Sequence, residues 1–212
     1  MKTISYAITA CNEHVELKRL LDQLDKHIRP EDEIMVQLDT NYTPEIREIV
    51  EGHGIGKRYE FHRIFASLNG DFASFKNNLN EHCTRDYIFQ IDADEYLSDQ
   101  LLEHLPFILD NNDVELYLVP RINTVEGLTE DHIKQWRWNV NENGWINYPD
   151  YQTRIIKNRT KIKWVGKVHE RLTRVSDNST PPVTAILPEG FELIHPKTIS
   201  RQEKQNNFYN TL

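Results

Sequence analysis

The segment at residues 85–97, RDYIFQIDADEYL, decides how the fold of this chain is interpreted. Its first part, residues 87–91, consists mainly of aromatic and β-branched side chains and predicts a buried strand. That strand runs directly into three acids, Asp92, Asp94 and Glu95. Carboxylates this close together repel one another and lose favourable hydration when they are buried. Their position at the end of a buried strand therefore needs a physical reason.

The chain around this segment alternates between strand and helix patterns. Strands are predicted at residues 3–9, 33–38, 58–65, 86–91 and 114–120, and helices at 13–27, 44–51, 71–82 and 98–109. This alternation predicts an α/β fold with a mainly parallel central sheet flanked by helices.

Polar segments follow three of the predicted strands: residues 9–13 (TACNE), Asp39 and residues 92–95 (DADE). In an open parallel sheet, ligands bind at the carboxyl ends of the strands. We therefore expect these three segments to meet at one edge of the sheet.

The second half of the chain is less regular. Residues 123–149 are rich in Trp, Asn and Gly, residues 151–172 predict a small antiparallel element, and residues 199–212 predict a terminal helix. Because no linker divides the chain, we expect a single domain, 1–212, made of the halves 1–122 and 123–212.

Composition excludes some functions. The net charge of -8 argues against a nucleic-acid partner, which needs a basic surface. The two cysteines, Cys11 and Cys83, lack metal-ligand spacing and are expected to be reduced thiols. The sequence shows no signal-peptide pattern and no apolar run of membrane-spanning length, so we expect a cytoplasmic location.

Three interpretations of the acidic cluster compete. Asp92, Asp94 and Glu103 match three ligand positions of an EF-hand, but Leu97 replaces its turn glycine. The cluster could instead be a solvated strand end that caps the next helix. The third interpretation is a metal–diphosphate site, in which the carboxylates hold a divalent cation and phosphate oxygens complete its coordination.

The motifs in the first half resemble those of family-2 glycosyltransferases with the GT-A fold. Residues 92–95 resemble the family's acidic metal-binding motif, and residues 9–13 its nucleotide-binding start. Residues 72–78 (FASFKNN) resemble a segment that usually reads Arg-Asn, with Lys76 in place of the arginine. The resemblance implies that the nucleotide sugar contacts Thr9, Ala10, Asn12, Glu13, Asp39, Lys76, Asn77, Asp92 and Ala93.

The resemblance continues in the second half. Residues 164–170 (WVGKVHE) are similar to the Gly-x-x-His-Glu segment of the subgroup that includes lipopolysaccharide-core glucosyltransferases. His195 and the helix start at residues 201–207 resemble the family's late histidine and final helix. The first half is then the nucleotide-sugar-binding half, and the second half faces the acceptor.

The implied chemistry is metal-dependent inverting transfer from a nucleotide-diphosphate sugar, with a UDP-hexose as the default donor. Mn²⁺ or Mg²⁺ is expected on Asp94, with Asp92 and His195 as further candidates. The carboxylate that takes the acceptor's proton is expected to be Glu170 or Asp150, with Glu95 also possible. Glu170 has an alternative, structural interpretation as the ion-pair partner of Arg154 or Arg171.

The acceptor is expected to be a hydroxyl group of a glycan, a lipid-linked glycan or a protein. An aromatic-rich patch is either a sugar-stacking platform or part of a core: Trp136, Trp138, Trp145 and Tyr148. Residues 154–174 carry eight Lys or Arg and one acid. This basic run is either a solvated face or an attraction for a phosphorylated acceptor or an anionic membrane surface.

Two other functions remain open at this point. A nucleotidyltransferase shares the α/β layer and the acidic metal site, but ITACNEHVE lacks the expected Gly-rich basic loop. A non-catalytic nucleotide- or sugar-binding protein could keep the same fold.

Overall fold

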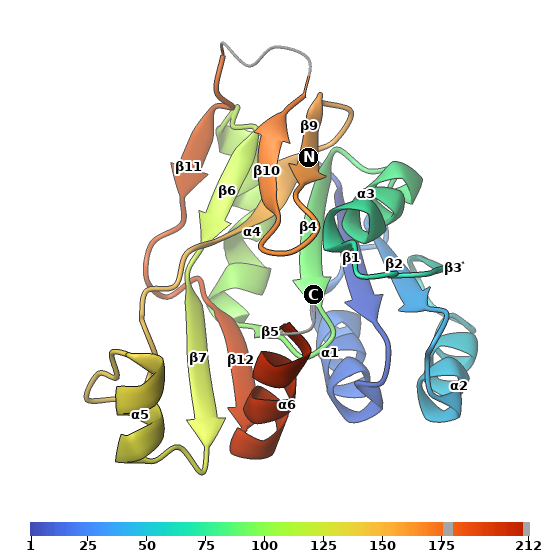
Figure 1. Ribbon diagram of the computed structural model, residues 1–212. Helices are drawn as coiled ribbons and strands as arrows, with labels where there is room; N and C mark the ends of the chain where they lie inside the picture. The colour runs from blue at the N-terminus through green and yellow to red at the C-terminus, as the bar shows by residue number, and fades with distance from the viewer. Residues whose placement is uncertain (176–179, 210–212) are drawn as a thin grey trace.

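The computed structural model describes residues 1–175 and 180–209. Its largest sheet has seven strands in the order β11-β6-β8-β4-β1-β2-β3 (Figure 1). The strands are β1 (Ile4–Ala10), β2 (Glu33–Asp39), β3 (Glu60–Ala66), β4 (Tyr87–Asp92), β6 (Leu116–Val119), β8 (Gln152–Lys157) and β11 (Thr184–Ile186). The neighbouring pairs among β1 to β4, and the pair β11–β6, are parallel, whereas β8 is antiparallel to both β4 and β6. The expected mainly parallel α/β sheet is therefore confirmed.

Helices cover both faces of this sheet because its strands present apolar side chains alternately to each face. Tyr6 and Ile8 of β1 belong to the large core, which also contains the apolar side of α1 (His14–His27), α2 (Pro44–His53) and α4 (Asp99–Asn111). Ala7, between them, belongs to a smaller core with Leu79 of α3 (Phe72–His82) on the opposite face. The alternation fixes the register of the strands and therefore the height at which each one ends.

Two smaller sheets extend the main one. β5 (Tyr96–Leu97), β12 (Leu193–Thr198) and β7 (Arg121–Glu126) form a three-stranded sheet, and β9 (Ile162–Val165) pairs antiparallel with β10 (Arg171–Arg174). The predicted antiparallel element is confirmed. β12 is followed by α6 (Ile199–Tyr209), and Figure 1 shows α6 and the three-stranded sheet lying beyond the carboxyl ends of β1 and β4.

Some boundaries differ from the expectation. The strand expected at 114–120 is present as β6 but is shorter, and it ends at Val119. Pro120 separates it from β7, because proline cannot donate a ladder hydrogen bond. The segment at 123–149, expected to be irregular, contains the end of β7 and the short helix α5 (Glu130–Trp136). The expected terminal helix is confirmed as far as residue 209, and residues 210–212 lie outside the described part of the chain.

Candidate active site

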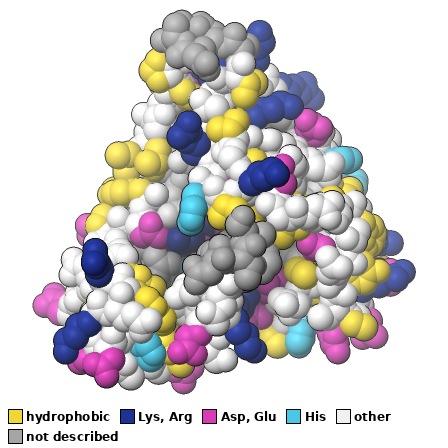
Figure 2. All heavy atoms as spheres, in the orientation of Figure 1, with side chains coloured by type: hydrophobic (Ala, Val, Ile, Leu, Met, Phe, Trp, Pro, Cys, Tyr) yellow, Lys and Arg dark blue, Asp and Glu magenta, His cyan; other side chains and the backbone are white. Residues whose placement is uncertain are grey.

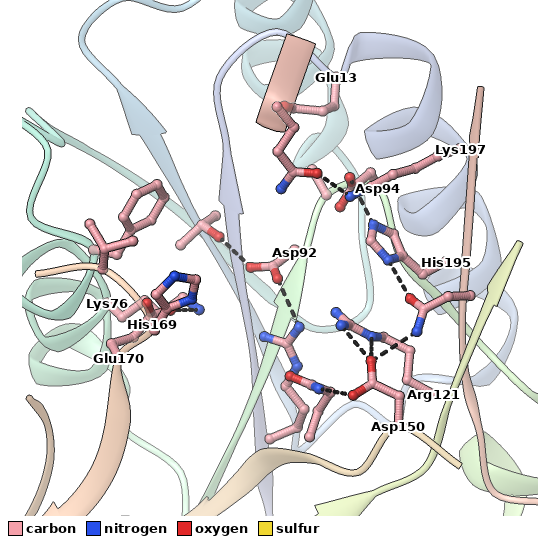
Figure 3. Close-up of a pocket in the computed structure, with 18 of the residues that line it drawn as sticks. Glu13, Lys76, Asp92, Asp94, Arg121, Asp150, His169, Glu170, His195 and Lys197 are labelled. Carbon is pink, nitrogen blue, oxygen red and sulfur yellow. Dashed lines mark hydrogen bonds and ion pairs between the residues drawn. The ribbon is translucent and has the colours of Figure 1, made fainter. Parts of the chain in front are cut away.

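A cavity of about 770 Å³ opens at the carboxyl ends of β1, β2 and β4. It brings together most of the residues that the sequence nominates: Thr9, Ala10, Glu13, Asp39, Lys76, Asp92, Ala93, Asp94, Asp150, Glu170 and His195 (Figure 3). In the space-filling view the hollow lies near the middle of the face shown, with charged side chains at its rim (Figure 2). The three segments that follow predicted strands do meet at one edge, as expected.

Three nominated residues lie outside the lining: Asn12, Asn77 and Glu95. Asn12 is exposed, and its backbone N–H donates to the carboxylate of Glu13 at 3.0 Å. The amide of Asn77 donates to the backbone oxygen of Trp164 and accepts from its N–H, both at 2.9 Å. Asn77 therefore joins α3 to β9.

The acidic cluster is divided between buried and cavity-facing carboxylates. Glu95 is fully buried, and its carboxylate accepts from Arg154 at 2.6 Å, from Arg121 at 3.1 Å and from the backbone N–H of Asp92 at 3.1 Å. Asp92 accepts from the hydroxyl of Thr9 at 3.1 Å and from Arg154 at 2.8 Å. A solvated strand end is therefore not what the structure contains, and Leu97 lies in β5, not in the turn of a calcium loop.

Electrostatics keep Asp92 ionised. Burial by itself raises the pKa of Asp92, but the guanidinium of Arg154 and the ammonium of Lys76 outweigh burial and hold this pKa far below its ordinary value. The same pairing raises the pKa of Arg154 above its ordinary value despite burial.

Asp150 extends these contacts toward the second half of the chain. It accepts from Arg121 at 2.7 and 3.0 Å, from Asn123 at 2.8 Å and from Gln152 at 2.8 Å. Burial favours a raised pKa for Asp150, but the charge of Arg121 and these hydrogen bonds lower the pKa below its ordinary value. We call the connected set of Asp92, Glu95, Arg121, Asp150 and Arg154 the buried ion network.

Asp94 points away from this network toward β12. Its carboxylate lies 3.2 Å from Nε2 of His195 and 3.3 Å from the guanidinium of Arg201 on α6. Burial raises the pKa of Asp94, but the hydrogen bond and charge of His195 outweigh it and hold the pKa at about 2. Asp94 is therefore a carboxylate throughout the physiological pH range.

Asn123 orients His195. The amide nitrogen of Asn123 donates to Asp150, so its amide oxygen faces Nδ1 of His195 at 2.9 Å and accepts its N–H. This contact turns Nε2 of the ring toward Asp94. Histidine ligands of metals are commonly oriented in this way, by a hydrogen bond from the ring nitrogen that does not bind the metal. A carboxylate and an imidazole nitrogen that face each other in a cavity fit a divalent cation such as Mn²⁺, whose other ligands would be phosphate oxygens and water.

A cluster of three potential metal ligands occurs elsewhere among the described residues. It consists of Glu33, Glu60 and His62 on β2 and β3. The carboxylate of Glu33 already accepts from Ser5 at 2.6 Å and from Thr84 at 2.7 Å. These contacts make Glu33 part of the packing between strands.

Glu170 lies in the loop between β9 and β10, on the other side of the cavity. Its carboxylate accepts from Lys76 at 2.6 Å, and the ammonium of Lys76 lies 4.7 Å from the centre of the Trp164 ring. Glu170 thus does form an ion pair, but among the described residues its partner is Lys76 and neither of the expected arginines, Arg154 and Arg171. Arg154 pairs with Asp92 and Glu95 instead.

The aromatic patch is not fully buried, and one of its members reaches the cavity. Trp136 and Trp138 lie 4.7 Å apart, as do Trp145 and Tyr148, measured between ring centres. All four side chains are half-buried, and Trp138 lines the cavity. The interpretation as part of a core is therefore wrong for these residues.

The basic run at 154–174 is not one solvated face. Arg154 is buried in the ion network, and three other members pair with acids: Lys157 with Asp113, Lys163 with Glu81, and Arg174 with Glu115. Of the helices in the described part of the chain, none has both the length and the apolar character to cross a membrane.

Three residues that line the cavity were not expected from the sequence: Arg121, Asn123 and Lys197. Their signal was the period of two in a strand. Arg121 and Asn123 are two residues apart in β7, so they lie on the same face of the strand. His195 and Lys197 have the same spacing in β12. Because His195 faces the cavity, the residue two positions on was a candidate to face it as well.

Solved structures share this fold. Residues 1–349 of S. aureus TarS match with a TM-score of 0.61 at 14% identity, covering 92% of this chain and 60% of that one. The same TarS segment in complex with UDP-GlcNAc matches with a TM-score of 0.58 at 17% identity, covering 89% and 59%. This chain thus spans about 60% of the length of those structures. The fold is the GT-A fold.

The sequence profile of glycosyl transferase family 2 matches residues 5–180. The chain belongs to this family, whereas the narrower lipopolysaccharide-core subgroup stays a prediction. A search among curated proteins finds no match.

Proposed function

We propose that this chain transfers a sugar from a nucleoside-diphosphate sugar to a hydroxyl group, with inversion at the anomeric carbon. The observation that carries the proposal is the pairing of Asp94 with Nε2 of His195 in a cavity at the carboxyl ends of the strands. Family membership supports the class of reaction. A UDP sugar is the proposed donor, since the similar TarS segment is described in complex with UDP-GlcNAc and with UDP.

Asp94 and His195 are the proposed ligands of a divalent cation, Mn²⁺ or Mg²⁺. When bound, such a cation neutralises charge on the diphosphate as it leaves. Asp92 is held by Thr9 and Arg154, so we propose that it contacts the donor through its ribose or through water. Asp39 accepts from the N–H and the amide of Asn41 at 2.8 and 3.1 Å at the end of β2, and we propose that it contacts the nucleoside.

Glu170 is the proposed base, which takes the proton of the attacking hydroxyl. Asp150 is the alternative, but four hydrogen bonds from three side chains stabilise its ionised form and reduce its basicity. Among the described residues Glu170 forms one ion pair, with Lys76 of α3, which precedes the acidic cluster in the chain. Glu95 is proposed no longer, because it is buried with both oxygens occupied.

Two aromatic side chains in the lining of the cavity support a saccharide acceptor, either free or attached to a lipid or protein. Trp138 and the half-exposed Tyr151 line the cavity on the side built by residues 121–151. Aromatic faces stack on the C–H surfaces of sugars, and the amides of Asn147 and Gln152 beside them can bond hydroxyl groups.

Calorimetric titration of UDP and GDP, with and without Mn²⁺, tests the donor site. The wild type should bind one nucleotide in a Mn²⁺-dependent way, and Asp94→Asn should weaken that binding by about 100-fold while Asp99→Asn, an exposed acid on α4, should not. Absence of binding by the wild type to either nucleotide would overturn the proposal.

Release of UDP from UDP-GlcNAc and UDP-glucose then separates an enzyme from a binding protein. Glu170→Gln keeps a hydrogen-bond acceptor for Lys76 and should lower turnover by about 100-fold or more with nucleotide binding retained. If Asp150→Asn lowers turnover and Glu170→Gln does not, the base assignment is reversed. Binding without any turnover by the wild type supports the non-catalytic alternative.

A further inference from the structure

Three of the cations that line the cavity form ion pairs with carboxylates. Lys76 pairs with Glu170, Arg121 with Glu95 and Asp150, and Arg154 with Asp92 and Glu95. Each of these side chains is buried or half-buried, and each charge is balanced by a carboxylate at 3.1 Å or less. Balanced pairs of this kind hold the cavity wall in place.

Lys197 differs from them. It is half-buried on β12, and its ammonium donates to the side-chain oxygen of Gln205, a neutral acceptor on α6. Within residues 1–175 and 180–207, no carboxylate lies within the 4.0 Å ion-pair distance of this ammonium. A partly desolvated cation without a counter-ion is costly unless a ligand supplies the negative charge.

The position of Lys197 in the cavity indicates which ligand could supply the negative charge. Lys197 and His195 are two residues apart on β12, so their side chains leave the strand on the same face. In Figure 3 both side chains extend toward Asp94. Their partners across the ladder, Val125 and Asn123 of β7, also line the cavity. The ammonium therefore belongs to the wall that carries the proposed cation ligands.

We infer that Lys197 is a further substrate-binding residue, whose ammonium binds the diphosphate of the donor and of the leaving nucleotide. This inference rests on the proposed glycosyl transfer. On donor binding the ammonium exchanges the neutral oxygen of Gln205 for a charged phosphate oxygen, and charge-assisted hydrogen bonds are roughly twice as strong as neutral ones. Departure of the nucleoside diphosphate concentrates negative charge on the phosphate beside this cation, which favours cleavage of the glycosyl bond.

The test compares UDP with UMP, each in the presence of Mn²⁺, by calorimetric titration of the full chain. Lys197→Gln should weaken UDP binding about tenfold and UMP binding by less than about threefold, because only UDP carries the second phosphate. Lys197→Arg, which keeps a cation, should bind UDP within about threefold of the wild type. Lys163→Gln is the matched control, since Lys163 is an exposed lysine paired with Glu81 at 2.9 Å.

The outcomes separate this inference from the proposed function. If the wild type binds UDP and Lys197→Gln binds it equally well, the assignment of Lys197 is wrong and the donor site stands. If Lys197→Gln weakens UDP and UMP equally and Lys197→Arg does the same, Lys197 is structural and the inference is overturned. If the wild type binds no nucleotide, both the inference and the proposed donor site are wrong.

Discussion

Two regions meet at the turn that follows β4, and they handle charge in opposite ways. On the inner side, the buried ion network pairs Asp92 and Glu95 with Arg154 at 2.8 and 2.6 Å, and Glu95 is fully buried. On the outer side, His195 and Lys197 of β12 line the cavity, and the ammonium of Lys197 contacts the neutral amide of Gln205. In the buried ion network the protein itself pairs each charge with an opposite one. On β12, the charge of Lys197 is available to pair with a bound ligand.

The comparison teaches how four consecutive residues, DADE, can serve both purposes. Asp92 and Glu95 face the arginines, and Asp94 faces His195. Matched charges stabilise the position of the turn, whereas a charge facing the cavity can respond to what binds there.

The largest expected effect follows from breaking the matched region. Glu95→Ala leaves Arg121 and Arg154 with one fewer carboxylate in a buried place, so the free energy of unfolding should fall by about 3–5 kcal/mol. Denaturant unfolding measures it. Glu81→Ala removes an exposed partner of Lys163 and should cost about 1 kcal/mol or less. Equal losses in the two variants would show that the network contributes no more than a surface pair.

A smaller effect is expected at Asp94, on the border between the regions. Its pKa of about 2 lies below the ordinary value of 3.8, so ionised Asp94 stabilises the folded state above about pH 4, and this contribution is lost as the pH falls toward 2. Asp94→Asn should therefore lower the free energy of unfolding by about 2 kcal/mol at pH 7 and by almost nothing at pH 2. The measurement is denaturant unfolding in chelator across this range. A difference between variant and wild type that does not change with pH would contradict the prediction.

The smallest expected effect is at Asn123, which touches both regions. Asn123→Ala removes the acceptor for Nδ1 of His195 and one donor to Asp150, so the affinity for Mn²⁺ in the presence of UDP should fall about tenfold. Titration of Mn²⁺ measures it. Asn111→Ala, at the exposed end of α4, is the control. Unchanged Mn²⁺ affinity in Asn123→Ala would mean that His195 needs no orienting partner, or that it is not a ligand.

Much of the fold could be predicted because its periodicity is local. The period of two in β1, β2 and β4 and the helical spacing in α1 and α4 are visible in short windows of sequence. The cap of α4 is local as well: the hydroxyl of Ser98 accepts from the N–H of Leu101, three residues further on. The antiparallel insertion of β8 between β4 and β6 was not predictable, because pairing between distant strands leaves no mark in either one.

The candidate site divides in the same way. The sequence alone determined that acids end one buried strand and that Asp39 ends another. It also determined that these segments resemble motifs of one family, because each motif lies within a single short segment. Only the tertiary structure decided that Arg154 serves Asp92 and Glu95 and that Glu170 pairs with Lys76. It also decided that Lys197 stands without a carboxylate among the described residues. The physical reason is that a charge is balanced by whatever lies within a few ångströms of it in space, and these partners are 59 to 94 residues away in the chain.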